Sequence, residues 1–308
     1  MQRPVLAIVG VTAGGKSALA MELARHDSRI ELVSVDSMQV YRGMDIGTAK
    51  ATRAERDEVP HHLLDLVDVW EDFTVGEFQA AARVAVADIE RRDRVPVLVG
   101  GSGLHLRAVI DNLEIPGQFP EVKASLEAQP TQAPYDRLLQ LDPVAARRIE
   151  PTNRRRLVRA VEVTAGSGRP FSSFGPGLDT YGGTRFGMVG PRWTRSCVDR
   201  RIVDRYALQM EQGLLDEVGS LAGNPKGISR TAGQALGYRQ FLRHILLDHT
   251  GSHSSIDESL EEAIVATRRF ARRQERWFRR DPRITWVDVE ANPMEAFDAV
   301  MREYKACI

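Results

Sequence analysis

The sequence has few of the features that mark secreted, membrane-spanning or disulfide-stabilised proteins. Only two of its 308 residues are cysteines, Cys197 and Cys307, and they lie far apart without the CxxC spacing of metal or redox sites. The six apolar residues near the N-terminus are too few for a signal-peptide core, and no later apolar run approaches the ~18 residues of a membrane span. These absences predict a cytoplasmic protein without disulfides, structural zinc or a membrane segment.

The sequence also lacks an excess of charge of either sign. Its 42 Lys and Arg residues balance 42 Asp and Glu residues, so the formal net charge at pH 7 is zero. This balance argues against a uniformly basic nucleic-acid binder, but it leaves a locally basic one open. Hydrophobic residues make up 43% and charged residues 27% of the chain, which is typical of a folded protein.

Strand and helix patterns alternate in the first hundred residues. Short apolar runs at Val5–Val9, Ile30–Val35 and Pro96–Val99 predict strands that are buried on both faces. Helical patterns at about residues 17–25 and 75–92 separate these runs. This strand–helix–strand–helix–strand order predicts an α/β fold with a parallel sheet flanked by helices.

The middle of the chain follows a different pattern, with several prolines, short helical segments and no strand-like run. We therefore expect a small helical insertion domain at residues 116–183, whose last part, from about residue 166, is a loop. The insertion would divide a core domain into a first part, residues 1–115, and a second part, residues 184–308. The second part is expected to return to the sheet and to contain a long basic helix near the C-terminus.

A glycine-rich motif follows the first strand. Residues 10–17, GVTAGGKS, match the G-x-x-x-x-G-K-[ST] pattern of a P-loop between a strand and a helix. Backbone N–H groups of such a loop cradle phosphate, the lysine neutralises phosphate oxygens, and the final hydroxyl can ligate Mg²⁺. The motif predicts a P-loop NTPase-like fold with a phosphate-chain site, and the alternative is a glycine-rich turn without a ligand. The residues concerned are Gly10, Val11, Thr12, Ala13, Gly14, Gly15, Lys16 and Ser17.

The carboxylate that an ATPase or kinase normally carries at a strand end is missing from the third strand, which ends in Gly100 and Gly101. Asp36 instead ends the second strand, where a carboxylate beside the phosphate cradle could act as a general base or bind a metal. Asp36 could also simply cap the following loop. Ser102 could form a hydrogen bond in the same site, although glycine-rich turns of this kind are also common without a function.

Arginines are concentrated in two segments. One lies near the end of the insertion and includes Arg155, Arg156 and Arg159, and the other extends from Arg268 to Arg280. Arginine makes planar, bidentate contacts with phosphate, so both segments favour binding to an RNA backbone. The alternative is that each segment is an ordinary solvated face.

Two further helical patterns bear on the site. Arg201 and Arg205 are four residues apart, so they share a helix face and could clamp a diphosphate opposite the P-loop. The alternative for this pair is an ordinary surface arrangement. The last long helix carries a stripe that predicts core packing rather than base stacking, formed by Ala263, Ala266, Phe270 and Trp277.

With these motifs the sequence resembles tRNA dimethylallyltransferases, the tRNA isopentenyl-transferase family, over essentially its full length. The most specific match is DSMQVYRGMDIGTAK at residues 36–50. Val11 stands where proline is usual, Ser17 and Ser102 where threonine is common, and His105 at a frequent tyrosine position. The other matching segments are residues 10–17, 60–65, 99–104, 141–146, 156–160, 234–239 and 267–280.

The resemblance implies transfer of a dimethylallyl group from dimethylallyl diphosphate to N6 of adenosine 37, in the anticodon stem-loop of tRNAs that read codons beginning with U. The P-loop would hold the diphosphate, with Mg²⁺ bound through Ser17, so the machinery of a kinase would not be needed. Asp36 would accept the proton of the amine, and Ser17 and Arg205 would help to stabilise the leaving diphosphate. We expect a monomer that binds tRNA and dimethylallyl diphosphate.

The resemblance also implies which residues contact tRNA. They are Asp36, Ser37, Met38, Gln39, Ser102, Lys123, Arg155, Arg156, Leu157, Val158, Arg159, Gln234, Ala235, Leu236, Gly237, Tyr238 and Arg239. Two functions of other classes remain as alternatives. One is a P-loop kinase of small molecules, and the other is an RNA-binding protein that uses a nucleotide as a switch. The missing strand-end carboxylate counts against both.

Overall fold

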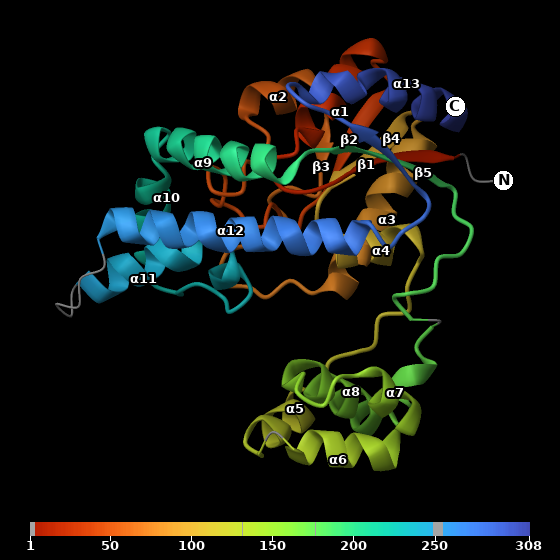
Figure 1. Cartoon of the computed structure of the whole chain (residues 1–308), viewed down its shortest axis with the longest axis vertical. Helices are drawn as coiled ribbons and strands as arrows, with labels where there is room; N and C mark the ends of the chain where they lie inside the picture. The colour runs from red at the N-terminus through yellow and green to blue at the C-terminus, as the bar shows by residue number, and fades with distance from the viewer. Residues whose placement is uncertain (1–3, 131, 176, 249–254) are drawn as a thin grey trace. The chain divides into compact units, whose positions relative to one another are not determined.

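The chain forms two compact units, one made of Met1–Asp111 and Gly183–Ile308 and the other of Asn112–Gly182 (Figure 1). The computed structural model describes residues 4–130, 132–175, 177–248 and 255–308. Residues 1–3, 131, 176 and 249–254, which fall within the expected domains, lie outside the described residues. The sequence pattern predicts that the insertion starts at residue 116, whereas the smaller unit of the structure starts at Asn112.

The larger unit is built on a six-stranded sheet in which all neighbouring strands are parallel. The strand order is β3-β2-β4-β1-β5-β6. The strands are β1 (Val5–Val9), β2 (Ile30–Val35), β3 (His61–His62), β4 (Val95–Gly100), β5 (Phe186–Arg192) and β6 (Ile284–Asp288). Every residue of β1 and β2 is buried, as expected where helices cover both faces of a sheet. The predicted α/β fold is confirmed.

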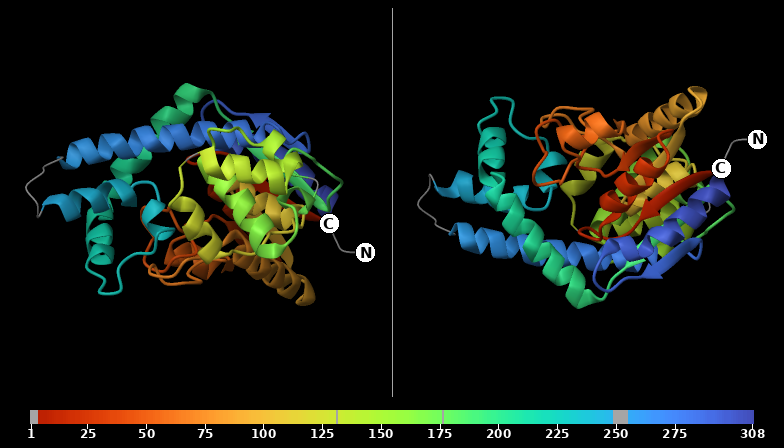
Figure 2. Two further views of the ribbon diagram at one scale, coloured as in Figure 1. Left: turned by 90° about the horizontal axis from the view of Figure 1, so that it is seen from below. Right: turned by 90° about the horizontal axis from the view of Figure 1, so that it is seen from above.

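Helices cover both faces of this sheet (Figures 1 and 2). One face is covered by α1 (Lys16–His26) and α13 (Phe297–Cys307), and the other by α3 (Val75–Arg91) and α4 (Gly103–Ile110). Four more helices pack on one another: α9 (Arg195–Glu211), α10 (Leu214–Ala222), α11 (Tyr238–Asp248) and α12 (Ile256–Phe278). The short elements are α2 (Arg53–Glu58), η2 (Ala232–Gln234) and η3 (Pro293–Ala296).

Helix α12 is rotated about its axis relative to the sequence prediction. Its buried residues are Ser259, Ala263, Thr267, Ala271, Gln274 and Phe278. Phe270 and Trp277, which were expected in the core, are only half-buried. The reason is that α12 packs against α4, α9 and α11 instead of lying on the apolar sheet, so polar side chains with partners occupy part of its buried face.

The smaller unit is a bundle of short helices with its own hydrophobic core. Asp142 accepts the backbone N–H of Ala145 at 3.0 Å and that of Ser172 at 2.7 Å, so one carboxylate caps a helix and holds the segment after the last helix. The last helix extends to Ser167, beyond the start of the predicted loop. The elements are α5 (Pro120–Glu127), α6 (Gln132–Leu141), α7 (Pro143–Arg148), α8 (Arg154–Ser167) and η1 (Phe171–Ser173).

Candidate active site

Three neighbouring strands of the larger unit end at the same level of the sheet. Val9 of β1 and Val35 of β2 both pair with Gly100 of β4. The P-loop, the turn that begins at Asp36 and the turn that begins at Gly101 therefore leave one edge together, where ligands of open α/β sheets bind. A cavity of about 490 Å³ lies there, lined by residues of all three turns and of α9 and α12.

The P-loop presents the start of α1 to this cavity. Within the described part of the chain, α1 begins at Lys16 without a side-chain cap. Gly15, the residue before it, has a φ of 86°, in the left-handed region that glycine tolerates best. The first N–H groups of an uncapped helix bind anions readily, so this end of α1 is suited to a phosphate group.

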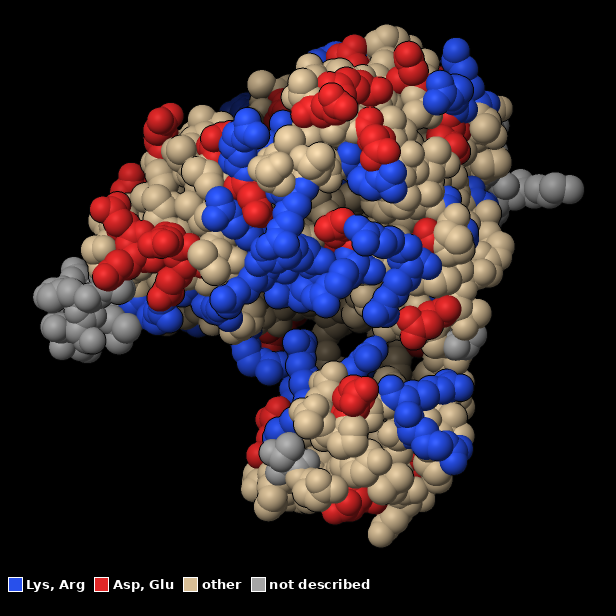
Figure 3. All heavy atoms as spheres, in the orientation of Figure 1, with Lys and Arg blue, Asp and Glu red and all other residues tan. Residues whose placement is uncertain are grey.

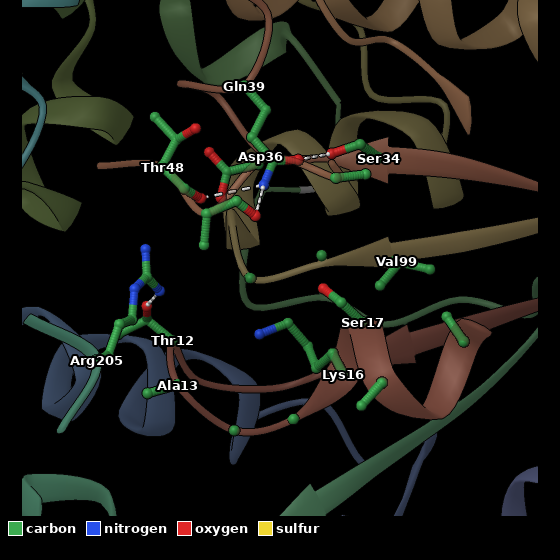
Figure 4. A pocket seen from close by; sticks show the side chains of 18 of the residues that line it. Thr12, Ala13, Lys16, Ser17, Ser34, Asp36, Gln39, Thr48, Val99 and Arg205 are labelled. Carbon is green, nitrogen blue, oxygen red and sulfur yellow. Dashed lines mark hydrogen bonds between the residues drawn. The ribbon is translucent and has the colours of Figure 1, made fainter. Parts of the chain in front are cut away.

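Lys16 extends from the P-loop into the cavity, and its Nζ donates to the backbone oxygen of Val11 at 2.7 Å (Figure 4). Burial lowers the pKa of Lys16 to about 8, the carboxylate of Asp36 opposes the shift, and Arg205 adds to it. A ligand that brings negative charge would favour the protonated lysine.

Arg205 reaches the same cavity from α9. Its Nη1 donates to Thr12 Oγ1 at 2.9 Å, and its Nη2 donates to the backbone oxygen of Gly47 at 3.2 Å. Burial lowers the pKa of Arg205, and Tyr206 and Asp36 oppose the shift, but a guanidinium remains ionised in proteins. Arg205 thus adds a second fixed positive charge beside the P-loop.

Arg201, one turn earlier on α9, also lines the cavity and supports the P-loop. Its Nε donates to the backbone oxygen of Ala13 at 2.7 Å, and its guanidinium lies 4.5 Å from the centre of the Trp193 ring. Trp193 Nε1 in turn donates to the backbone oxygen of Gly14 at 2.9 Å. The two arginines therefore face the P-loop together, as their spacing predicts, and Arg201 is already engaged in holding the loop.

The carboxylate of Asp36 faces the open space that Lys16 and Arg205 also face (Figure 4). Its Oδ1 accepts the backbone N–H of Met38 at 2.8 Å, so Asp36 also closes its own turn. Oδ2 has no hydrogen-bonding partner among the described residues, which leaves it available to a substrate. The two interpretations of Asp36 from the sequence, a residue that caps the following loop and a general base or metal ligand, are thus compatible.

The turn that carries Asp36 is tied to the β4 turn. Ser102 Oγ accepts the backbone N–H of Ser37 at 3.2 Å. Gln39 Nε2 donates to the backbone oxygens of Thr48 and Ala49 at 3.1 and 3.2 Å, so it holds part of the cavity wall. The residues from Ser37 to Gln39 are half-buried, and each is positioned by the protein itself.

A carboxylate from α10 holds the wall of the cavity near Gly47. Glu217 accepts the backbone N–H groups of Asp45, Ile46 and Gly47 at 3.0, 2.8 and 3.2 Å, and it also accepts a hydrogen bond from the Tyr238 hydroxyl. Burial raises the pKa of Tyr238 and Glu217 adds to the shift, so the phenol remains a donor. A Cβ at Gly47 would lie 2.4 Å from the Tyr238 ring, which requires glycine there.

A buried lysine fixes the end of the same segment. The Lys50 side chain is completely buried, and its Nζ donates to the backbone oxygen of Tyr41 at 2.7 Å and to carboxylates of Asp45 and Asp65 at 2.6 Å. Arg56 pairs with the other oxygen of Asp65 at 2.7 Å. This network explains why the segment from residue 36 to 50 combines glycine, acid and lysine at fixed spacing.

Only part of the segment from residue 234 to 239 is accessible to RNA in this structure. Gln234 and Arg239 are exposed and Leu236 is half-buried. Ala235, Gly237 and Tyr238 are buried, and Tyr238 serves the contact with Glu217 described above.

In the smaller unit, some of the residues that the resemblance implies as tRNA contacts are exposed and others are buried. Arg155 and Arg156 are exposed, and Lys123 is half-buried and lies 3.8 Å from Glu127. Leu157 and Val158 belong to the hydrophobic core of this unit. Arg159 donates to Glu162 Oε1 at 2.9 Å and to the backbone oxygen of Pro116 at 2.8 Å, so it is partly committed to the fold.

Sequence reasoning missed two residues of α12 that line the cavity, Phe270 and Gln274. Phe270 was placed in the core, and Arg273 lies over its ring at 5.6 Å from the centre. Gln274 was given no role. The one signal for both was their position within residues 267–280, a segment that carries the family resemblance. His105, by contrast, packs edge-on against Phe78 at 4.9 Å, and burial lowers its pKa to about 4.

Positive side chains gather over α12 on one face of the molecule (Figure 3). Arg269, Arg273 and Arg276 are exposed and Arg272 is half-buried. None of these four has an acidic partner within the described ranges. They lie on the side of the helix away from its buried residues and form a basic row of side chains, of which Arg273 lies over the ring of Phe270 at the cavity.

The described residues lack two kinds of feature. They contain no group of three or more His, Cys, Asp or Glu side chains arranged to hold a metal ion. They also contain no helix that is both long and apolar enough to cross a lipid bilayer.

Known proteins resemble this chain in sequence and in structure. Residues 39–281 match the family model described as IPP transferase. A tRNA dimethylallyltransferase of Thermobifida fusca is 47% identical over 97% of this chain and 93% of its own length. A full-length tRNA isopentenylpyrophosphate transferase from Bacillus halodurans, solved by crystallography, is 35% identical, with a TM-score of 0.69 and coverage of 99% of this chain and 98% of that one.

A eukaryotic dimethylallyltransferase, crystallised in stages of its action on tRNA, is 25% identical, with a TM-score of 0.80. That match covers 98% of this chain and 77% of the eukaryotic protein. The family model covers well over half of the chain, and the bacterial relatives match almost end to end. The resemblance in the sequence is therefore confirmed, and the chain belongs to the IPP transferase family.

Proposed function

We propose that this chain is the enzyme that transfers a dimethylallyl group from dimethylallyl diphosphate to N6 of adenosine 37 in tRNAs reading codons that begin with U. One observation carries the proposal. The Asp36 carboxylate faces Lys16 and Arg205 across a cavity that opens on the uncapped start of α1. An acceptor for a proton and a cradle for a diphosphate thus share one space, in a chain whose curated relatives are named tRNA dimethylallyltransferase.

In this mechanism the bond between C1 of the dimethylallyl group and the diphosphate oxygen breaks as N6 of the adenine forms a bond to C1. The proton that N6 loses passes to Asp36. Negative charge collects on the departing diphosphate, where Lys16, Arg205 and the N–H groups of α1 stabilise it. Because no γ-phosphoryl group is transferred, β4 can end in Gly100 without an acid.

We infer that Mg²⁺ accompanies the diphosphate. Ser17 is exposed, and its hydroxyl lies at the cavity (Figure 4). Mg²⁺ is commonly held by one or two protein oxygens together with phosphate oxygens of the substrate, so the residues present fit this ion. When bound, the ion would neutralise part of the charge on the leaving diphosphate.

The basic row on α12 supports tRNA as the partner. The arginines at positions 269, 272, 273 and 276, which have no acidic partner among the described residues, are suited to phosphates of an RNA backbone. Gln234 and Arg239 on the larger unit, and Arg155 and Arg156 on the smaller one, are exposed and remain our proposed tRNA contacts. The target base must leave its stack, at a cost of about a few kcal/mol that is smallest in a loop. We place the reaction in the cytoplasm and expect a monomer.

The test is incubation with dimethylallyl diphosphate, Mg²⁺ and unmodified tRNA that carries A36-A37-A38, followed by mass spectrometry of the nucleosides. We expect adenosine 37 to gain one C5H8 unit, and a tRNA with guanosine at position 37 is the control. A P-loop kinase or a nucleotide-dependent switch would instead consume ATP. Hydrolysis of ATP without any gain of mass on adenosine 37 would refute the proposal.

The affinity for dimethylallyl diphosphate should fall at alkaline pH because of Lys16. Below the pKa of about 8 the lysine is already protonated, so the Kd should change little between pH 7 and 8. Above that pKa the lysine must take up a proton when the anion binds, so the Kd should rise about tenfold per pH unit until the pKa of the complex is reached.

Calorimetric titration from pH 7 to 10 measures this dependence, and Lys16→Arg is the control because arginine remains charged throughout. Titration of the ligand itself would appear in both proteins. Equal pH dependence in the two proteins would contradict the role of Lys16.

A further inference from the structure

Gln274 joins two of the three turns that form the cavity. Its Oε1 accepts the backbone N–H of Thr12 at 2.9 Å, and its Nε2 donates to the backbone oxygen of Gly101 at 2.8 Å. Gln274 is 7% exposed; its bond to Gly101 is buried and its bond to Thr12 is partly buried. The three residues come from α12, the P-loop and the β4 turn, and only the fold brings them together.

The surroundings leave little freedom for another side chain at these positions. A Cβ at Gly101 would lie 2.7 Å from Gln274 Nε2 and 3.0 Å from the backbone oxygen of Gly10, so the close approach requires glycine. The side chain at position 274 must place one acceptor and one donor at the same distance from the backbone as glutamine does. Glutamate lacks the donor, methionine has no donor and only a weak acceptor, and asparagine is one methylene shorter.

The two hydrogen bonds of Gln274 form a bridge between Thr12 and Gly101. Both ends of this bridge lead directly to groups that the proposed mechanism uses. Thr12 also binds Arg205, through its hydroxyl, at 2.9 Å. On the other side, Gly101 precedes Ser102, whose Oγ accepts the N–H of Ser37 at 3.2 Å. Ser37 directly follows Asp36. One continuous path of covalent and hydrogen bonds therefore connects Arg205 at the diphosphate cradle with the proton acceptor, and Gln274 is its central link.

We propose that Gln274 is a positioning residue that sets the separation between the diphosphate cradle and Asp36. The expected effect of Gln274 on prenyl transfer rests on the proposed function. The expected effect of Gln274 on anion binding does not depend on tRNA. Loss of the bridge releases the N–H of Thr12 and allows the P-loop peptide to rotate away from Arg205. As a result, the P-loop binds diphosphate more weakly, and the distance between the leaving diphosphate and Asp36 no longer suits the transfer.

The test compares Gln274→Met with Gln79→Met. Gln79 is also buried, at 9% exposure, and donates to the backbone oxygen of Ala108 at 2.6 Å, away from the cavity. Both variants should lose similar thermal stability. In the presence of Mg²⁺, only Gln274→Met should raise the Kd for inorganic diphosphate, about tenfold, because the anion must then also order the released P-loop backbone when it binds. Gln274→Glu should raise it further, because its carboxylate lies beside the anion.

The single-turnover transfer rate at saturating diphosphate should also fall in Gln274→Met and remain at the wild-type value in Gln79→Met. An unchanged Kd in Gln274→Met, or equal losses of affinity in the two variants, would overturn the proposal. If Gln274→Met does not fold, Gln274→Asn decides in the same way. If the wild-type protein binds diphosphate without modifying tRNA, the proposed function fails while the comparison of Kd values still decides the role of Gln274.

Discussion

Replacement of Asp36 by asparagine should lower the rate of prenyl transfer about a thousandfold, the middle of the range for loss of a general base. Asparagine keeps an oxygen that can accept the N–H of Met38, so the turn should retain its shape. Binding of tRNA should therefore be preserved. Single-turnover transfer with both substrates saturating measures the rate, and a filter-binding titration with tRNA measures the affinity.

Asp204→Asn is the matched control for this variant. Asp204 is an exposed residue whose carboxylate also belongs to the lining of the cavity, on α9 beside Arg205. We expect this variant to keep nearly the wild-type rate. Full activity in Asp36→Asn would exclude Asp36 as the base, and a large loss in Asp204→Asn alone would move that role to α9.

Replacement of Arg205 by methionine should lower the transfer rate by about 10² to 10³, the usual cost of removing one donor that stabilises developing charge. The effect should appear in the rate at saturating diphosphate, because charge on the leaving group is greatest in the transition state. Arg205→Lys should recover only part of the rate, since the compact ammonium on a shorter side chain does not reproduce the planar fork with which the guanidinium spans Thr12 and Gly47.

Arg200→Met separates this effect from a general loss of positive charge. Arg200 is exposed on the same helix and does not line the cavity. Its removal should leave the rate constant for transfer unchanged. If Arg200→Met and Arg205→Met slowed transfer equally, the contribution of Arg205 would be long-range attraction of substrate and not stabilisation of the diphosphate.

The sequence was sufficient to predict the elements whose local pattern and final environment agree. The run Val5–Val9 is wholly apolar because both faces of β1 are covered, and two of the P-loop positions with positive φ, Gly10 and Gly15, are glycines. Asp36 could be predicted as a site residue for the same reason, since ligands of open α/β sheets bind at the carboxyl ends of the strands, where Asp36 lies beside the P-loop.

The remaining features depend on contacts between distant segments. Phe270 and Trp277 fit an apolar stripe on α12, yet the helix is rotated because Gln274 and Thr267 have partners on other elements. The roles of Tyr238 and Gly47 are set by Glu217 of α10, which no local pattern reveals. A run of residues that carries a family resemblance can therefore contain both surface and buried positions, and only the fold separates them.

The order of strands in the sheet has a consequence for the synthesis of this protein. Strand β1 is paired on one side by β4 and on the other by β5, which begins at Phe186. At translation rates of roughly 5–20 residues per second, one edge of β1 waits on the order of ten seconds or more for its partner. An unpaired apolar edge is a template for association with other chains. The helices of Asn112–Gly182 emerge during this interval with a core of their own. Aggregation of the nascent chain is therefore most favoured between the appearance of β4 and that of β5.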